Sequence, residues 1–194
     1  AGLASPGARK SKVRVAKVYL GVPQAHWPVP TMDLGAEMQA YEAAFAERAE
    51  AFADVDFHVW ELVTTVEQAA ALRDRLADMD GVLAIHLSMG IMGMLAEVLK
   101  AAKPTVLFAA PYSGHEWTQF GALQREPEGV LLECMLTSDR GQLAAAVRPF
   151  RAIHHMREAR ILNVTSRALP EDFVRGARTR FGTEIVPVDR DRVL

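Results

Sequence analysis

The sequence contains a single cysteine and no long apolar segment. Cys134 has no second cysteine with which to form an intrachain disulfide, so a disulfide-stabilised scaffold is excluded and a reducing compartment is compatible. In the apolar run VLLECML, this residue is expected to be a small buried hydrophobe. No run approaches the roughly 18 apolar residues that a membrane-spanning helix needs. We therefore expect a cytoplasmic protein without a membrane segment.

Several well-known signatures are also missing. No GxxxxGK[ST] motif is present, which excludes a P-loop, and there is no CxxC or HExxH. The turn GVPQAH lacks the glycines that bring a dinucleotide fold close to pyrophosphate. It also lacks the Ser/Thr/Gly pattern that would hold an FMN phosphate, which argues against a flavin protein. The net charge of −2 offers no electrostatic footprint for nucleic acid or an anionic membrane.

Apolar, strand-like runs instead alternate with amphipathic, helix-like segments along the 194 residues. Continuous apolar strands that alternate with helices are typical of a parallel sheet covered on both faces. The pattern predicts an α/β protein with a flavodoxin-like, doubly wound parallel sheet, followed by the start of a second α/β unit. The expected strands of the sheet are 13–22, 55–63, 81–89, 105–111 and 130–138.

The predicted organisation has three parts. Residues 1–12, basic and rich in Ala, Ser, Gly and Pro, are expected to be a disordered tail. Residues 13–157 form the flavodoxin-like domain, and residues 158–194 begin a second domain with a strand, a helix ending at Gly182 and another strand. Because the sequence starts with Ala and stops just after EIVPV, we expect a truncated piece of a longer protein.

Candidate binding residues follow three of the predicted strands. Ligands of open α/β sheets bind outside the carboxyl ends of the strands, so loops that follow neighbouring strands would converge on one edge. Loop aromatic residues beside polar groups are common at ligand sites and interfaces. The candidates are Gln24, His26 and Trp27 after the first strand, His86, Ser88 and Met89 after the third, and His115, Glu116 and Trp117 after the fourth.

Other interpretations of these residues stay open. His86 lies within a predicted strand, where a core histidine with a satisfied hydrogen bond is common. Trp60 is expected in the core, and the adjacent His154 and His155 are expected to be partly exposed or capping, because neighbours on a helix do not share a face. The turn HLSMGIMG presents backbone N–H groups of a helix N-terminus to an anion. A metal site at His115 and Glu116 would need a third ligand.

Three stretches resemble a known family. The Gln/His/Trp loop, DGVLAIHLSMG (80–90) and KPTVLFAAPYSGHEW (103–117) are similar to the N-terminal part of the L-fucose isomerase and L-arabinose isomerase superfamily. The resemblance covers residues 13–194, which would be less than half of a typical member. It implies an aldose–ketose isomerase that uses a divalent metal, usually Mn²⁺, to polarise the oxygens of the sugar.

The resemblance also limits what this chain contributes. The metal ligands of the family lie later in its chain, and no position here matches them, so we assign no catalytic residue and no metal ligand and expect no activity from these residues alone. The N-terminal domain of the family mediates homo-oligomer contacts and directs loops toward a neighbouring active site. The nine candidates would then contact a sugar or polyol. The alternative is a stand-alone carbohydrate-binding or regulatory α/β module, similar to one half of a periplasmic sugar-binding protein.

Overall fold

The computed structural model describes residues 11–111, 115–165 and 167–190. The chain divides into two compact units, one formed by residues 12–150 and the other by Ser11 with residues 151–190. The division falls between Phe150 and Arg151, inside a helix, whereas the sequence placed it between residues 157 and 158. Of the predicted disordered tail, residues 1–10 lie outside the described residues.

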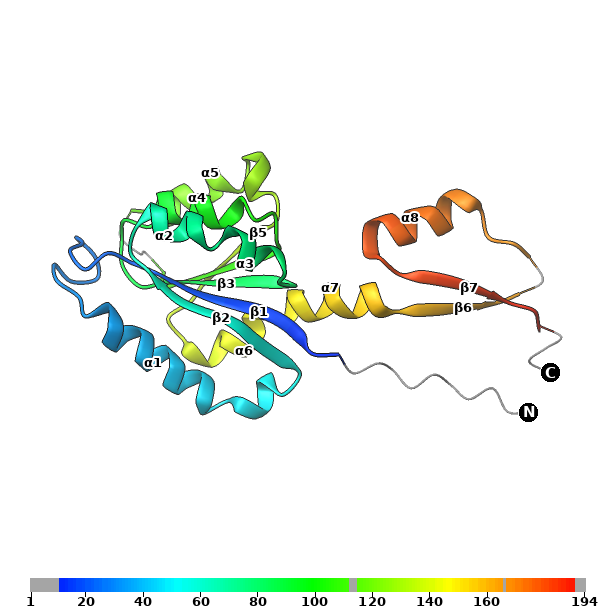
Figure 1. The fold of residues 1–194 in the computed structure, drawn as a ribbon, viewed down its shortest axis with the longest axis horizontal. Coiled ribbons are helices and arrows are strands. Elements are labelled where there is room, and N and C mark those ends of the chain that lie inside the picture. The colour runs from blue at the N-terminus through cyan, green and yellow to red at the C-terminus, as the bar shows by residue number, and fades with distance from the viewer. Residues whose placement is uncertain (1–10, 112–114, 166, 191–194) are drawn as a thin grey trace. The chain divides into compact units, whose positions relative to one another are not determined.

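The larger unit is built on a five-stranded, all-parallel sheet (Figure 1). The strand order β2-β1-β3-β4-β5 is the flavodoxin-like doubly wound order, which confirms the predicted fold class. Strand β3 is buried along its whole length, as expected for a strand covered on both faces. The strands are β1 (Val13–Leu20), β2 (Val55–Val63), β3 (Gly81–His86), β4 (Thr105–Ala109) and β5 (Leu132–Leu136).

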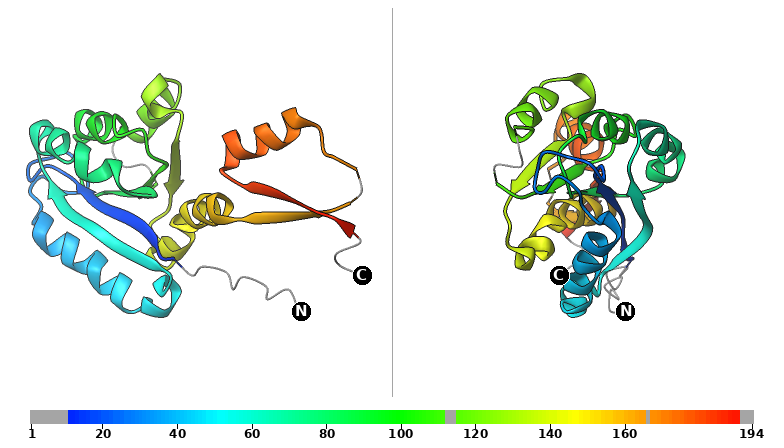
Figure 2. Two further views of the ribbon diagram at one scale, coloured as in Figure 1. Left: turned by 45° about the vertical axis from the view of Figure 1, so that its right-hand side comes forward. Right: turned by 90° about the vertical axis from the view of Figure 1, so that its left-hand side faces the viewer.

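Helices cover both faces of this sheet, as Figures 1 and 2 show. One apolar cluster lies between the sheet and α1 with α6, and a second lies on the opposite face beneath α2 to α5. Short 3-10 turns complete the unit. The helical segments are α1 (Leu34–Ala46), η1 (Ala49–Phe52), α2 (Val66–Ala71), α3 (Arg73–Ala77), α4 (Met92–Leu99), α5 (Trp117–Leu123), η2 (Pro127–Gly129), η3 (Arg140–Gln142), α6 (Leu143–Ala146) and α7 (Arg148–Glu158).

Strand β2 carries a residue that the sequence placed wrongly. Trp60 was predicted to be in the core, but it is 58% exposed. The strand lies at the edge of the sheet, and its pairing with β1 contains a register shift between the partners Phe57 and Val59. Because a bulge reverses the alternation of side chains, Phe57 and Val59 pack against opposite clusters, and the sequence alternation cannot reveal this.

The smaller unit contains a parallel pair of strands, β6 (Arg160–Val164) and β7 (Glu184–Val188), joined by α8 (Glu171–Phe181). Helix α8 ends at Gly182, whose φ of +71° is the left-handed conformation that glycine adopts at helix ends. An apolar hollow of about 650 Å³ lies between β6 and α8, lined in part by Ile161 and Phe173. In the part of the chain that the structure describes, no helix has the length and apolar character needed to cross a membrane.

Cys134 lies on β5, opposite Leu107 of β4, and is half-buried against the core. Burial, followed by the nearby charge of Glu133, raises the pKa of this thiol to about 11. The thiolate is the reactive form, so at pH 8 the folded protein should react with a disulfide reagent roughly 100-fold more slowly than the chain in denaturant. Equal rates in the two states would show that the pKa of the thiol is not raised.

The same shift predicts the sign of a pH effect on stability. Since the pKa of the Cys134 thiol is higher in the folded than in the unfolded chain, its stabilising contribution is present below the unfolded pKa and is lost as pH rises toward about 11. Cys134→Ala should therefore flatten the decline of the unfolding free energy on the alkaline side of pH 9. Denaturant titrations of both proteins at pH 8 and pH 10.5 would measure the difference.

Candidate functional site

The three strands that precede the candidate residues are neighbours in the sheet. Strand β1 pairs with β3, and β3 pairs with β4. The chain leaves β1 for β2 on one side and then crosses to β3 on the other, so the strand order reverses between β1 and β3. This topological switch point is the position at which doubly wound folds bind ligands, outside the carboxyl ends of the strands.

The connection from β1 to α1 is a folded loop. The Met32 N–H donates to the carbonyl of Pro23 (2.9 Å), and Gln24 forms an isolated antiparallel bridge with Thr31. The loop ends where Asp33 caps α1 by accepting a hydrogen bond from the backbone of Ala36 (2.9 Å). Within this loop Gln24 and His26 are exposed, whereas Trp27 is half-buried.

Ser88 fastens this loop to the turn that follows β3. The Val22 N–H donates to Ser88 Oγ (2.7 Å), and the Ser88 hydroxyl donates to the carbonyl oxygen of Val22 (2.8 Å). The Met89 N–H donates to the carbonyl oxygen of Trp27 (3.0 Å). Gly90 follows with a φ of +107°, a conformation that other residues rarely adopt. Ser88 is fully buried and its hydroxyl proton is used here, so its role in the structure is to bridge two loops.

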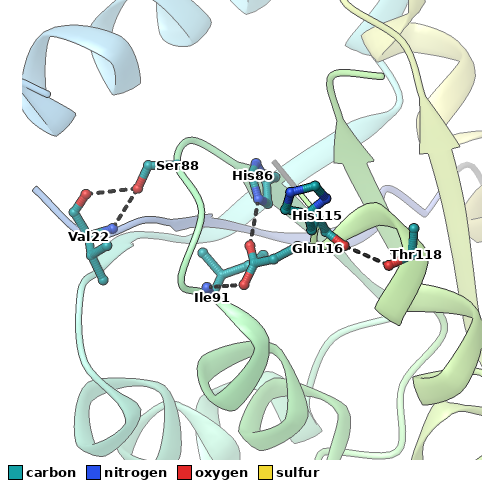
Figure 3. Close-up of polar contacts among 7 residues, drawn as sticks. All are labelled: Val22, His86, Ser88, Ile91, His115, Glu116 and Thr118. Atoms are coloured by element: carbon teal, nitrogen blue, oxygen red, sulfur yellow. Dashed lines mark hydrogen bonds and ion pairs between the residues drawn. The ribbon is translucent and has the colours of Figure 1, made fainter. Parts of the chain in front are cut away.

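A buried histidine–glutamate pair links β3 to the segment after β4. His86 is the last residue of β3, and Glu116 precedes α5. Glu116 Oε2 lies 3.0 Å from His86 Nε2, and Glu116 Oε1 accepts a hydrogen bond of 3.0 Å from the N–H of Ile91 (Figure 3). The side chains of His86 and Glu116 are 0% and 7% exposed. One carboxylate therefore connects two strand-end segments.

The carboxylate of Glu116 occupies the anion position that the HLSMGIMG turn predicted. Ile91 is the N-cap residue of α4, and the N-terminus of a helix carries partial positive charge and unpaired N–H groups. The sequence left open which anion would bind there. In the structure the anion belongs to the chain itself, which stabilises the segment after β4 against the start of α4.

The imidazole of His86 has one nitrogen without a partner among the residues that the structure describes. Its ring contacts the rings of Trp27 (centroids 5.6 Å apart) and Phe120 (6.1 Å). A carboxylate can only accept, so Nε2 carries a proton, while Nδ1 accepts a hydrogen bond in a neutral ring and donates one in a charged ring. Nδ1 is buried and has no hydrogen-bond partner within the described residues. Such atoms are uncommon in proteins, and each one calls for an explanation.

The structure corrects the predicted position of Trp117. The sequence placed it in an irregular loop, but it is the first residue of α5 and is 37% exposed. His115, also exposed, lies in the turn before the helix, where its carbonyl accepts a hydrogen bond from the Thr118 hydroxyl (2.7 Å; Figure 3). Tyr112, Ser113 and Gly114 of the same predicted loop lie outside the described residues.

The nine predicted residues thus fall into two groups. Hydrogen bonds and ring contacts join the first group into one buried or half-buried network: Trp27, His86, Ser88, Met89 and Glu116. The second group is exposed on the segments that this network holds: Gln24, His26, His115 and Trp117. Sequence reasoning did not identify Val22 and Ile91, which enter through their backbone atoms, because backbone contacts leave no signal in residue type.

The described residues at this edge of the sheet do not fit a catalytic Mn²⁺ centre. Mn²⁺ prefers several oxygen ligands, whereas the buried network offers a single carboxylate beside one imidazole. Both oxygens of that carboxylate already accept hydrogen bonds, from His86 and Ile91. No protein-family model and no curated protein matches this sequence.

Proposed function

We propose that the unit of residues 12–150 binds a sugar or polyol at the carboxyl edge of β1, β3 and β4. In this proposal it is the N-terminal portion of a metal-dependent aldose–ketose isomerase of the L-fucose/L-arabinose type. It contributes substrate-facing residues and contacts between identical subunits, and metal and proton-transfer groups come from elsewhere in the enzyme. The proposal includes a cytoplasmic location, with which a single cysteine is compatible.

The buried His86–Glu116 pair at the switch point is the observation that carries this proposal. A protein seldom buries an imidazole and a carboxylate together where only packing is required, and here one ring nitrogen has no partner among the described residues. The pair lies where the fold places its ligands, and Trp27 packs against it. A ring nitrogen at this position is suited to a hydroxyl group, which can both donate and accept a hydrogen bond and which polyols supply in abundance.

The exposed residues of the second group would contact the ligand first. Aromatic faces such as that of Trp117 suit the polarised C–H groups of a sugar, while Gln24 and the imidazoles of His26 and His115 donate and accept hydrogen bonds with hydroxyls. Glu116 acts as a positioning residue, because its two hydrogen bonds hold the start of the segment that carries Trp117. Small-molecule sites commonly combine an apolar surface with a few convergent polar groups in this way.

The proposal is tested by measuring how tightly variants with substitutions at this edge bind sugars. Trp117→Ala should weaken binding of L-fucose, L-arabinose or the corresponding alditol by up to about 10-fold, since a lost stacking face is worth about 0.5–1.5 kcal/mol. Glu116→Gln, which keeps the shape but removes the charge, should weaken binding to a similar degree. Isothermal calorimetry of the purified chain measures both, with thermal unfolding recorded alongside.

Trp60→Phe is the matched control. Trp60 is also an exposed tryptophan, but it lies on edge strand β2, away from the carboxyl ends of β3 and β4. Its replacement should leave sugar affinity unchanged. If Trp117→Ala unfolds like a core variant, the residue is structural and the argument from the edge fails. If no sugar or alditol binds to the unaltered chain at millimolar concentration, the proposed ligand class is wrong.

The stand-alone carbohydrate-binding module is the second candidate, and it uses the same edge of the sheet. Neither function places a metal ion at His86 and Glu116, so the misfit of a Mn²⁺ centre there is compatible with both. The two functions differ in what the natural full-length product does with a bound sugar. An isomerase converts an aldose to its ketose when Mn²⁺ is added, whereas a binding module retains the sugar unchanged and binds it equally well in the presence of a chelator.

A further inference from the structure

The end of α7, in the smaller unit, gathers three side chains that ligate metals. One donor atom from each of His154, His155 and Glu158 lies within 4.8 Å of the other two. His154 is half-buried, whereas His155 and Glu158 are exposed. The sequence treated the two histidines as separate surface residues, because neighbours on a helix point in different directions. In the structure their rings are in contact, with centroids 5.5 Å apart.

Glu158 explains how the cluster forms. It follows His154 by four residues and His155 by three, and both spacings place side chains next to each other on a helix. The distance from His154 Nε2 to Glu158 Oε2 is 3.6 Å. Ligands about 2.0 Å from a tetrahedral metal are roughly 3.3 Å from one another. Small rotations of these side chains would therefore complete three corners of a tetrahedron.

A fourth residue orients the carboxylate. The hydroxyl of Ser11, which belongs to the same unit, donates to Glu158 Oε1 and also lies 2.8 Å from His154 Nε2. Because Ser11 binds Oε1, the other oxygen, Oε2, is the one that faces His154. A hydrogen bond that fixes one oxygen of a ligating carboxylate is the usual partner of a metal ligand outside its coordination sphere.

We propose that His154, His155 and Glu158 bind a zinc ion, with Ser11 as the hydrogen-bond partner that positions Glu158. Two imidazoles and one carboxylate form a ligand set typical of Zn²⁺ sites that keep a fourth position for water or another ligand. The set is too rich in nitrogen and too poor in oxygen for Mg²⁺ or Ca²⁺. This site is independent of the sugar-binding edge, because its residues belong to the other compact unit.

The test uses the full chain, freed of metal with a chelator and then titrated with zinc. We expect one equivalent of Zn²⁺ to bind after dialysis, measured by elemental analysis, and Co²⁺ to give the intense visible absorption of a tetrahedral site. His154→Gln and Glu158→Gln should each weaken binding by at least about 100-fold, and Ser11→Ala by about 10-fold. Circular dichroism checks that the helices persist in each variant.

His58→Gln provides the matched control. His58 Nε2 lies 3.0 Å from Asp56 Oδ2 on the exposed surface of β2, and this histidine–carboxylate pair has no third ligand among the described residues. This variant should bind zinc as the unaltered chain does. The proposal is overturned if the unaltered chain binds no zinc at micromolar concentration. It is also overturned if His154→Gln and Glu158→Gln bind zinc as tightly as the unaltered chain.

Discussion

Replacing Gly81 with alanine is expected to lower the free energy of unfolding by about 3 kcal/mol. A Cβ atom at this first position of β3 would lie 2.2 Å from Phe150 Cδ1 and 2.4 Å from its Cγ. Phe150, in the first turn of α7, is fully buried in the apolar cluster against the sheet, so its ring cannot simply turn into solvent. Chemical denaturation followed by circular dichroism measures the loss.

Two further variants separate this clash from a general effect of replacing glycine. Gly121→Ala in α5 introduces a Cβ whose nearest neighbour is the flexible end of Arg125 at 3.9 Å, so it should be neutral or stabilise by up to about 1 kcal/mol. Adding Phe150→Leu to Gly81→Ala should recover part of the lost stability by making room for the methyl group. A Gly81→Ala protein that unfolds at the same denaturant concentration as the unaltered chain would contradict the described packing of Phe150.

Replacing Lys17 with alanine is expected to cost about 3 kcal/mol or more. Lys17 lies on β1 with its side chain 6% exposed, and its ammonium group is 2.6 Å from Glu42 of α1. The rings of Phe45 and Phe57 contact the same ammonium group, at 4.6 and 4.7 Å from their centroids. Removal of the cation would leave the carboxylate of Glu42, only 24% exposed, without its charge partner.

Tyr19 binds the same carboxylate, so a variant that removes Glu42 must also account for the Tyr19 hydroxyl. Its hydroxyl donates to Glu42, and burial, reinforced by this hydrogen bond, raises the pKa of Tyr19 well above its ordinary value. The triple variant Tyr19→Phe/Lys17→Met/Glu42→Leu should be much closer to the unaltered chain than Lys17→Ala, since it leaves neither a buried charge nor the Tyr19 hydroxyl without a partner.

The exposed pair Arg75–Glu61 is the control for Lys17. Its side chains are 51% and 41% exposed, and Arg75→Ala should cost less than about 1 kcal/mol. Unfolding free energies from urea titrations give the comparison. Equal losses for Lys17→Ala and Arg75→Ala would mean that burial does not decide the strength of these pairs.

The fold could be predicted from the sequence because its strands and helices are marked by regular patterns of apolar residues. Apolar runs such as those of β3 and β4 are continuous because both faces are covered, and Gly182 ends α8 as predicted. Helix α5 was missed because its seven residues are too few for a helical period to emerge. The exposure of Trp60 depends on a bulge and an edge position, which are properties of strand pairing rather than of local sequence.

The candidate site could be predicted only in part, because its contacts join residues that are far apart in the sequence. Residues after strand ends can be found from topology alone, so His86, Glu116 and Trp27 could be selected in advance. Their pairing could not, because the contact between His86 and Glu116 joins residues far apart in sequence whose loops meet only in the folded sheet. The cluster at His154 was not predicted, because it depends on the contacts of Glu158 with both histidines and on Ser11, which lies far earlier in the sequence.

The folded loop between β1 and α1 bears on the thermodynamics of any ligand that reaches Gln24 or His26. The loop already contains a Gln24–Thr31 bridge, a hydrogen bond from Met32 to Pro23 and two further prolines, Pro28 and Pro30. A segment restrained in this way has little conformational freedom left to lose when it is contacted. The entropy of ordering a loop would then subtract little from the affinity, and even a few weak hydrogen bonds to hydroxyl groups would be retained in the binding free energy.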